Sequence, residues 1–378
     1  MKITIVMGAF LPMPPAGFGA VERVWHGLAK WFVRRGHQVT LVCKAGPGEA
    51  DQESLEGMTL YRLKGFARTN RLGSDLAKDL LYSVRCLKLL PKADILVTNT
   101  FWLPALAPRL VPSAGRVVVH VARAPKKQYW LYRGAARFDA VSNFIRDRIV
   151  SDHPELAPKV RTFPNPIDLD VLSCERSGRR EAKAATIVYV GRLHPEKGVH
   201  LLVESFRVVT EKIPTARLRL IGPWAAAQGG AGPEYLNSLK GLAKGLAVEF
   251  AGPVSDQRTI AEALWSSNVF CYPSLAERGE ALPLAPLEAM ATGLVPVVSA
   301  LKQFMDYIQP GVNAVTFDHR SSAASDNLAR ALIGLLLDRD RLARLSKSAT
   351  ARAHEFGYEH VGEMRLRDYE ELLREQRG

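Results

Sequence analysis

Two cations follow an apolar run in the second half of the chain. Arg192 comes two residues after the run 186–190, and Lys197 follows five residues later, beside Gly198. Arginine supplies a planar fork of donors and lysine a compact charge, so the pair suits the binding of a diphosphate. Two solvated surface cations are the alternative. Their position between a strand and a glycine favours the anion site.

Two carboxylates stand eight positions apart further along. Glu280 and Glu288 flank an apolar, proline-containing turn that leads into a helix pattern, so we expect Glu280 in the loop and Glu288 on the helix. A carboxylate can accept from the vicinal hydroxyls of a ribose or hexose, and turn amides such as those of Leu284 and Ala285 can meet phosphate oxygens. The alternative is that Glu280 is exposed and Glu288 pairs with a residue on its own helix. The spacing alone favours this alternative over a sugar-binding role.

A glycine-rich loop also follows the first apolar run. Residues 7–19 hold three glycines and three prolines, and a helix pattern begins at Ala20. Glycine at a helix N-terminus lets backbone N–H groups approach a phosphate. A tight strand-to-helix turn with no ligand is the alternative interpretation.

The elements that carry these residues alternate between strands and helices. The predicted strands are 3–6, 38–43, 95–97, 117–119, 140–141, 186–190, 217–221, 248–250, 269–272 and 295–299. This alternation predicts an α/β protein with two doubly wound, Rossmann-like parallel-sheet domains facing a cleft. We expect residues 1–170 plus about 357–378 to form an N-terminal domain and residues 171–356 a C-terminal domain. The polar segment 173–183 is the expected linker.

Two amphipathic helices are predicted in the first domain. The helix that begins at Ala20 has an apolar face formed by Val21, Val24, Trp25, Leu28 and Phe32. A second helix is expected over 74–90, with Leu76, Leu80, Val84 and Leu87 turned inward. Both faces follow the helical spacing of apolar residues.

Together these segments resemble the retaining glycosyltransferases of family 4, also called glycosyl transferases group 1, which have the GT-B fold. The resemblance covers essentially the whole chain. It rests on the segments 19–23, 35–40, 141–142, 165–168, 191–198 and 280–291. The last two blocks are highly specific together, because the family's E-x7-E motif falls on Glu280 and Glu288.

The resemblance implies roles for single residues in a nucleotide-sugar transferase. Glu288 would hold the ribose of a nucleotide-diphospho-sugar donor, and Glu280 would contact the donor sugar. Arg192 and Lys197 would bind the diphosphate, helped by the amide near Gly19. The donor-binding set further includes Gly222, Val254, Leu284 and Ala285, with Val254 beside the base. His120, at the end of a predicted strand, resembles the family's active-site histidine; a loop histidine with no catalytic role is the alternative. The catalytic set is therefore His120, Glu280, Arg192 and Lys197.

The sequence departs from the family pattern at three places. Gly19-Ala20 stands where many members have Gly-Gly, Leu282-Pro283 where many have Phe-Gly, and Asn165-Pro166 where Asn-Gly is usual. Proline has no N–H to offer a phosphate, so that role falls to Leu284 or Ala285.

We expect no metal cofactor. Asp168 and Asp170 form a D-x-D pattern, but the resemblance places them in the interdomain hinge, and Arg192 and Lys197 already supply the positive charge that a metal would bring. No motif places a nucleophile. We therefore expect front-face substitution with retention at the anomeric carbon, as the resemblance implies, rather than a covalent glycosyl-enzyme.

Net charge indicates an anionic partner. The chain carries 51 basic and 38 acidic residues, and +11 of the net +13 lies in residues 1–170. Basic residues gather around the predicted helix 74–90 and around an aromatic stretch: Arg62, Lys64, Arg68, Arg71, Lys78, Arg85, Lys88, Lys92, Lys126, Lys127 and Arg133, beside Tyr129, Trp130 and Tyr132. This mixture suits a glycan, lipid-linked or other phosphate-bearing acceptor at an anionic membrane surface, as in polysaccharide or glycolipid synthesis. An ordinary soluble acceptor is the alternative.

Other features bound the function classes. Residues 1–6 indicate a first strand rather than a signal peptide, and no apolar run is long enough to span a bilayer. Four separated cysteines indicate a reducing compartment, so we expect a cytoplasmic enzyme, at most peripheral on the inner face of the cytoplasmic membrane. Two other interpretations remain: a GT-B-fold nucleotide-sugar epimerase, whose acid/base carboxylates are not evident here, and a basic nucleic-acid-binding protein, which lacks any supporting motif.

Overall fold

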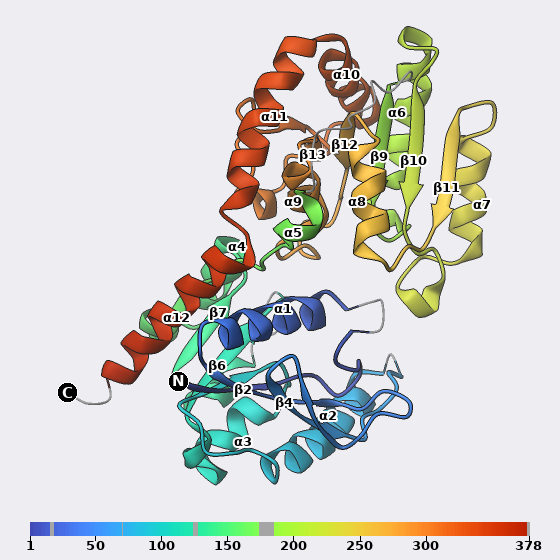
Figure 1. Cartoon of the computed structure of the whole chain (residues 1–378). Coiled ribbons are helices and arrows are strands. Elements are labelled where there is room, and N and C mark those ends of the chain that lie inside the picture. Colours follow the sequence, from blue (N-terminus) through green and yellow to red (C-terminus); the bar gives the residue numbers. More distant parts are fainter. Residues whose placement is uncertain (16–18, 70, 124–127, 174–184, 376–378) are drawn as a thin grey trace. The chain divides into compact units, whose positions relative to one another are not determined.

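The chain divides into two compact units, each with its own sheet. The computed structural model describes residues 1–15, 19–69, 71–123, 128–173 and 185–375 (Figure 1). Unit 1 consists of Met1–Pro166 and Tyr358–Gly378, and unit 2 of Ile167–Gly357. Beyond Ser173, the predicted linker lies outside the described residues, as does Cys174. Both units are parallel-sheet α/β structures, which confirms the predicted fold class.

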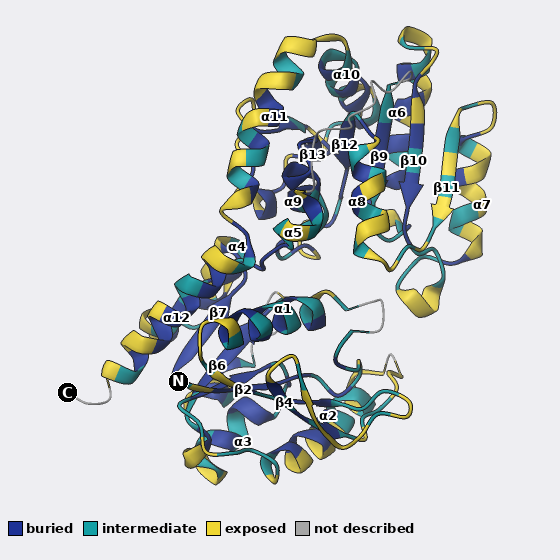
Figure 2. Cartoon of the chain, in the orientation of Figure 1, coloured by how far each residue is buried: buried dark blue, intermediate teal, exposed yellow. Residues whose placement is uncertain are grey.

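Unit 1 is built on an eight-stranded sheet with the order β3-β4-β2-β1-β5-β6-β7-β8. Its strands are β1 (Lys2–Val6), β2 (Gln38–Lys44), β3 (Gln52–Leu55), β4 (Met58–Leu63), β5 (Ile95–Thr98), β6 (Arg116–Val121), β7 (Arg137–Ala140) and β8 (Val160–Thr162). Figure 2 shows the central strands buried, as expected for a sheet covered on both faces. Only β3 pairs antiparallel, through a tight turn at Glu56 and Gly57, both with positive φ. The sequence analysis did not predict β3, β4 or β8.

Helices cover both faces of this sheet. They are α1 (Ala20–Arg34), α2 (Leu72–Leu87), α3 (Leu103–Leu110), α4 (Asn143–Asp152) and α12 (Tyr358–Arg374). Figure 1 shows α1 and α12 on one face, and α2 and α3 on the other. The predicted apolar face of α1 is confirmed, since Val24, Trp25, Leu28 and Phe32 are buried and Val21 is half-buried.

The predicted inward face of α2 is wrong. Leu80 and Val84 are exposed and Leu76 and Leu87 are only half-buried, whereas the buried side chains are Asp79, Tyr82, Ser83 and Cys86. The reason lies in Asp79: its Oδ2 accepts the backbone N–H groups of Phe101 and Trp102, at 2.9 and 3.1 Å, where α3 begins. Capping these N–H groups turns a polar face of α2 inward and leaves its leucines in solvent.

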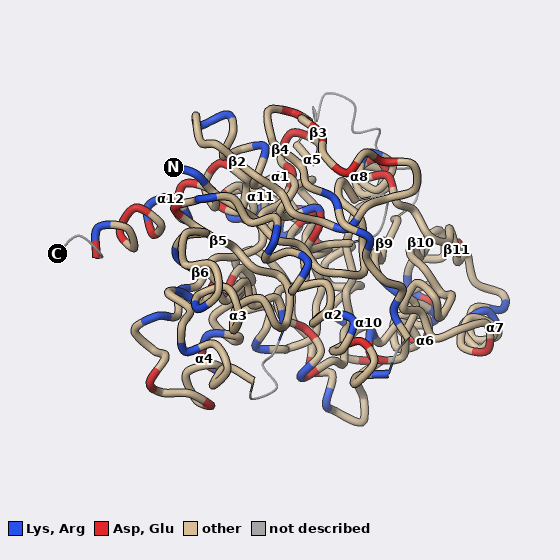
Figure 3. The backbone as a smooth tube through the Cα atoms, turned by 90° about the horizontal axis from the view of Figure 1, so that it is seen from below, with Lys and Arg blue, Asp and Glu red and all other residues tan. Residues whose placement is uncertain are grey.

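Close contact between α1 and α12 depends on two glycines. A Cβ at Gly27 would overlap the ring of Tyr358, and a Cβ at Gly362 would overlap the ring of Trp31. The Tyr358 hydroxyl also donates to the carbonyl of Arg23 at 3.2 Å. Acidic and basic residues alternate along α12 (Figure 3). The last helix of the chain is thereby an integral part of unit 1.

Unit 2 has a six-stranded, fully parallel sheet with the order β11-β10-β9-β12-β13-β14. Its strands are β9 (Thr186–Val190), β10 (Arg217–Ile221), β11 (Val248–Gly252), β12 (Val269–Tyr272), β13 (Val295–Ser299) and β14 (Val315–Phe317). Its helices are α5 (Leu169–Leu172), α6 (Val199–Lys212), α7 (Pro233–Leu242), α8 (Gln257–Trp265), α9 (Leu284–Ala291), α10 (Ala324–Leu337) and α11 (Arg339–His354). The helix α6 packs on α7 and α10, whereas α9 packs on α5 and α11.

The strand order of unit 2 reverses direction between β9 and β12. In doubly wound sheets, ligands bind outside the carboxyl ends of the strands at such a switch point. The loops that follow β9 and β12 are the ones that carry Arg192, Lys197 and Glu280. The fold thus brings the sequence-predicted cations and carboxylate to the same edge of one sheet.

Candidate active site

Glycines allow the loops at this edge to approach one another. Gly222 follows β10 with φ 146°, and a Cβ there would overlap the carbonyl oxygen of Gly191, which follows β9. Gly198 has φ 64°, and a Cβ there would overlap the carbonyl oxygen of Pro273, just after β12. Only glycine tolerates both the backbone conformation and the contact. The loop that holds Arg192 and Lys197 therefore lies directly against the ends of the neighbouring strands.

Both predicted cations are paired with carboxylates. The guanidinium of Arg192 donates to Oε1 of Glu196 at 2.6 Å and to the carbonyl of Gly229 at 2.7 Å. The ammonium of Lys197 lies 2.5 Å from Oε1 of Glu280 and 4.0 Å from Oε1 of Glu196. The four side chains form an alternating row of charges whose sum is zero. An entering diphosphate must therefore compete with carboxylates for these cations.

Lys197 and Arg192 differ in accessibility. The Lys197 side chain is 7% exposed and its ammonium lies over the ring of Tyr272, 5.7 Å from the centroid. The Arg192 side chain is 42% exposed. Ser274 Oγ donates to the same Glu280 oxygen at 2.7 Å, so this carboxylate is fixed from two sides. Lys197 is a rigidly held charge, whereas Arg192 can change partner at little cost.

The helix α9 begins beside this charge row. Glu280 lies in the loop and Glu288 on the helix, as predicted, with Pro283 as the residue before the first turn. Leu284 and Ala285 are half-buried in that first turn. First-turn amides have no intrahelical acceptor and carry the positive end of the helix dipole, so they can bind an anion. The hydroxyl of Tyr307 donates to the carbonyl of Pro283 at 2.8 Å and fixes the turn.

The remaining donor-binding candidates of unit 2 lie at the same sheet edge. Gly222 follows β10, and its N–H donates to the carbonyl of Gly252 at 2.8 Å. Val254 is half-buried in the loop after β11. Asp168, by contrast, accepts the backbone N–H of Val171 at 3.2 Å and caps α5. Within the described ranges, no group of three or more His, Cys, Asp or Glu side chains could hold a metal ion.

In unit 1, Gly19 precedes α1 with φ 135°. This φ is one that L side chains rarely adopt, so the backbone conformation favours glycine here, and the carboxylate of Glu22 fills the space beside its Cα. Glu22 is buried in the first turn of α1, and burial raises its pKa above the usual value. The sequence analysis did not single out Glu22, although its place three residues after a helix N-cap is a recognisable signal for a side chain that folds back on the turn.

His120 is the penultimate residue of β6, and it lies opposite Asp139 in the register of the neighbouring strand β7. Its ring is 8% exposed and meets the ring of Trp25 edge-on, with centroids 5.2 Å apart. Neither ring nitrogen has a hydrogen-bond partner in the described part of the chain. Burial, with a contribution from the Arg365 charge, holds the pKa of His120 well below its usual value, so the ring is neutral at neutral pH.

Arg365 is a residue that the sequence analysis missed. It lies on α12, is fully buried, and forms an ion pair with Asp139, which is also fully buried. Its guanidinium is sandwiched between the rings of Trp25 and Phe163, at 5.0 and 4.9 Å. No local pattern marks this pair, because its members are 226 positions apart. A helix from the end of the chain thus supplies the charge beside His120.

Two further expectations change with the structure. Arg62 is not a surface charge, since it is 3% exposed and pairs with Glu49 and Glu53 near β3. Lys126 and Lys127 lie outside the described residues. Every helix in the described ranges falls short of the length and apolar character that crossing a membrane requires.

Comparison with known proteins matches the two halves of the chain to two families. Residues 21–171 match the model of Glycosyltransferase Family 4, and residues 175–352 match that of Glycosyl transferases group 1. Spore coat protein SA of Bacillus subtilis is 23% identical over 98% of this chain and 99% of its own length. Phosphatidyl-myo-inositol mannosyltransferase of Mycobacterium tuberculosis is 28% identical over 55% of this chain, which spans about half (53%) of that relative.

Solved structures share the fold at low sequence identity. Sucrose-phosphate synthase from Thermosynechococcus elongatus superimposes with a TM-score of 0.79 at 18% identity, over 98% of this chain and 99% of that one. Anabaena HepE in complex with UDP-glucose gives a TM-score of 0.71 at 18% identity, over 96% and 98%. None of these matches favours the epimerase or the nucleic-acid-binding interpretation. The two family matches and the two parallel sheets agree: the chain belongs to the group 1, family 4 glycosyltransferases of the GT-B fold.

Proposed function

We propose that this glycosyltransferase moves a hexose from a nucleotide-diphospho-sugar to a glycan or lipid-linked acceptor, with retention at the anomeric carbon. The observation that carries the proposal is the Lys197–Glu280 ion pair, which joins the loop of Arg192 and Lys197 to the loop that leads into α9 at the switch point of the unit 2 sheet. Two cations beside a helix N-terminus suit a diphosphate. Among the structural relatives, HepE was solved with UDP-glucose.

Each donor-site residue has a proposed role. Arg192 and Lys197 stabilise the negative charge that develops on the leaving nucleoside diphosphate, and the amides of Leu284 and Ala285 add hydrogen bonds to its oxygens. Glu288 accepts from the ribose hydroxyls, and Glu280 contacts the donor sugar. Gly222 lets the backbone come close to the ligand, and Val254 lies beside the base. Gly19 offers its backbone at the start of α1 in unit 1.

The chemistry follows from the charges that form when the glycosidic bond to phosphate breaks. The leaving group gains negative charge and the sugar gains positive charge. Fixed cations take the place of a metal in this scheme, so turnover is expected to persist in EDTA. The Glu280 carboxylate is engaged by Lys197 and Ser274 rather than free to attack, which supports front-face substitution over a covalent intermediate.

His120 is proposed to contact the transferred sugar near its anomeric carbon. A neutral imidazole offers one donor and one acceptor nitrogen, and both nitrogens of His120 lack partners among the described residues. The neutral state matters because a cationic ring would repel the positive charge that forms on the sugar. Its two open positions therefore suit hydroxyl or ring oxygens of a hexose.

The acceptor is proposed to be presented at an anionic membrane surface. Four apolar side chains of α2 are exposed, namely Leu72, Leu80, Leu81 and Val84. Arg71, Arg85 and Lys88 are exposed basic residues on or beside the same helix. A helix with apolar and basic exposed sides binds anionic interfaces. A mycobacterial relative is named for mannosyl transfer to phosphatidyl-myo-inositol, and a glycolipid or polysaccharide pathway would fit such a surface.

Two experiments test these proposals separately. Thermal shifts with UDP-, GDP- and ADP-sugars identify the donor, since a saturating ligand raises the stability of the protein by several kcal/mol. Transfer to an acceptor, followed by NMR of the anomeric configuration of the product, then tests retention. Flotation with anionic liposomes tests the surface. Leu80→Ser with Leu81→Ser is expected to abolish flotation, whereas Leu337→Ser, at a more exposed leucine of unit 2, is not. Inversion of the anomer, or flotation unaffected by the α2 changes, would contradict the respective proposal.

A further inference from the structure

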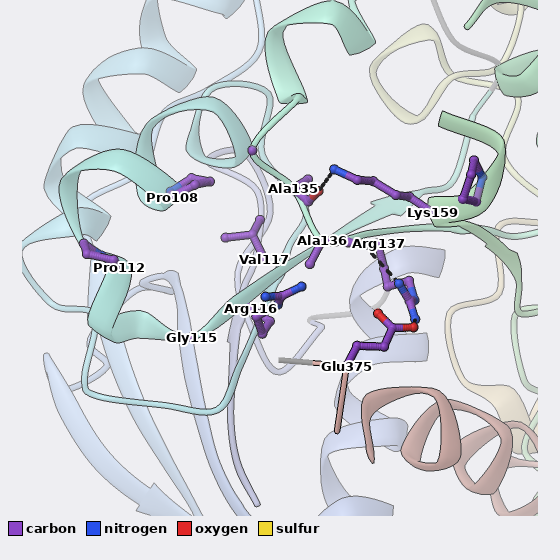
Figure 4. A pocket seen from close by; sticks show the side chains of 12 residues that line it. Pro108, Pro112, Gly115, Arg116, Val117, Ala135, Ala136, Arg137, Lys159 and Glu375 are labelled. Carbon is purple, nitrogen blue, oxygen red and sulfur yellow. Dashed lines mark hydrogen bonds and ion pairs between the residues drawn. The ribbon is translucent and has the colours of Figure 1, made fainter. Parts of the chain in front are cut away.

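A pocket of about 520 Å³ opens at the amino ends of β6, β7 and β8 in unit 1. Each of these three neighbouring strands is introduced by a cation: Arg116 is the first residue of β6, Arg137 the first of β7, and Lys159 precedes β8. All three side chains line the pocket (Figure 4). Parallel strands bring their starts to one edge of a sheet, so the three charges converge there.

This pocket is separate from the candidate active site. His120 lies four residues beyond Arg116 on β6. At about 3.3 Å per residue, that separation places the pocket roughly 13 Å away along the strand, at the opposite edge of the same sheet. A ligand in it would not reach the residues proposed for sugar transfer.

The three cations differ in how far their donors are used. Arg137 donates to two carboxylates, Asp368 at 3.3 Å and Glu375 at 2.6 Å, and to the carbonyl of Ala136 at 3.5 Å. Lys159 donates to the carbonyls of Arg133 and Ala135. The Nε–H of Arg116 is buried and has no hydrogen-bond partner among the described residues. An unpaired buried donor is costly, and this cost is removed if the guanidinium turns and donates to a ligand in the pocket.

Among the described residues that line the pocket, Glu375 alone carries a carboxylate. Its side chain is 43% exposed, and Figure 4 shows it beside Arg137. The hydrogen bond from Arg137, with the nearby charges of Arg137, Arg161 and Arg116, holds the pKa of Glu375 below its usual value. Three lining cations against one half-exposed carboxylate leave a net positive charge. Glu375 is therefore a carboxylate held by the Arg137 guanidinium, from which a stronger hydrogen-bond acceptor can displace it.

The rest of the lining is small and rigid. It consists of Pro108, Pro112, Pro158, Val117, Ala135, Ala136, Gly115 and Gly134. The volume lies within the range of small-molecule sites, and apolar walls with a few converging charges suit a ligand that has both an anionic group and a compact body. The guanidinium fork matches the oxygens of a phosphate better than it matches a single point charge.

We propose that this pocket binds a small phosphorylated molecule, with the guanidinium of Arg116 donating to its phosphate and Glu375 acting as the competing anion at the neighbouring Arg137. The proposal concerns a second site in unit 1 and does not depend on the donor site. Phenyl phosphate, which joins one phosphate to a compact apolar body, is a suitable probe.

NMR of arginine Nε–H groups reads this site directly. The signal of Arg116, assigned by its loss in Arg116→Lys, is expected to shift saturably with phenyl phosphate, with a dissociation constant on the order of 1 mM. Glu375→Gln should tighten binding about fivefold, since it removes the competing charge. The same shift in an Arg192→Ala protein, which keeps the buried Lys197–Glu280 pair, would exclude the donor site as its cause.

Matched controls make the outcome decisive. Potassium chloride at equal ionic strength and benzoate, a carboxylate of similar shape, should each produce a much smaller shift. Arg109→Gln, at an exposed arginine of α3 outside the lining, should leave the titration unchanged. No saturable shift of Arg116, an equal response to benzoate, or a titration unaffected by Glu375→Gln would overturn the proposal.

Discussion

The ammonium of Lys197 and the carboxylate of Glu280 form a 2.5 Å ion pair in which both side chains are 7% exposed. The two residues are 83 positions apart, and the pair joins the loop after β9 to the loop after β12. Burial makes such a pair strongly dependent on both members, since removal of either leaves an uncompensated charge. The same contact therefore bears on stability and on the proposed catalysis.

The first prediction concerns stability. Lys197→Met should lower the free energy of unfolding by about 3 kcal/mol, because Glu280 is left buried and unpaired, and adding Glu280→Gln should restore part of that loss. Arg219→Met provides a control, since Arg219 pairs with Glu249 at 2.7 Å but is 32% exposed. Its cost should stay below about 1 kcal/mol. Denaturant unfolding measures all three, and an equal cost for Lys197→Met and Arg219→Met would contradict the role given to burial.

The second prediction concerns turnover. Arg192→Ala should reduce kcat by about 100-fold or more, because a fixed cation that stabilises the leaving group contributes about 3 kcal/mol to the transition state. The Arg192 side chain is 42% exposed, so the folded state should survive its loss. Arg219→Ala, again a paired arginine of unit 2, should retain normal turnover. Wild-type kcat in Arg192→Ala, with release of the nucleoside diphosphate as the assay, would remove this residue from the mechanism.

The third prediction concerns the carboxylate that occupies Arg192 when no donor is bound. Glu196→Gln should lower the KM for the donor about fivefold, the equivalent of about 1 kcal/mol, because the diphosphate no longer competes with Glu196 for the guanidinium. Glu249→Gln changes the matched pair at Arg219 and should leave KM unaltered. An increase in KM for Glu196→Gln would show that this carboxylate assists donor binding instead.

The fourth prediction concerns pH. Burial and the Arg365 charge hold the pKa of His120 well below its usual value, so the native state does not take up this proton near pH 6.5, whereas the unfolded chain does. The free energy of unfolding therefore loses a contribution from His120 as pH falls below about 6.5. His120→Phe should remove that part of the slope. In NMR, the His120 ring should remain neutral at pH 6, and a ring that titrates near 6.5 in the native protein would contradict the burial argument.

Much of the fold could be predicted because local patterns of apolar residues in the sequence determine it. The strands 186–190, 217–221, 269–272 and 295–299 begin and end in the structure where the apolar runs placed them. The same holds for Glu280 in a loop and Glu288 on the following helix. The strands 269–272 and 295–299 are buried at every position, because a parallel sheet covered on both faces selects continuous apolar runs that are visible in the sequence.

The wrong or missed predictions concern residues whose burial or pairing depends on a partner far away in the sequence. On α2, Asp79 turns inward because it caps the start of α3, and the spacing of leucines cannot reveal a hydrogen bond to residues more than twenty positions away. The hairpin β3–β4 was missed because its first strand is polar and exposed. The pairing of Lys197 with Glu280 and of Arg365 with Asp139 depends on tertiary structure, so a sequence shows the charges without showing that they are already occupied.

The central claim is that Arg192 and Lys197 bind the diphosphate of the donor, and titration calorimetry with UDP, GDP and ADP tests it most directly. We predict saturable binding of one nucleotide to the wild-type protein. The affinity for that nucleotide should be at least tenfold weaker in Arg192→Ala, a loss of about 1.4 kcal/mol in binding free energy, and unchanged in Arg219→Ala. Equal affinity of the wild-type and Arg192→Ala proteins for the nucleotide that binds, or no binding of any of the three, would contradict the account.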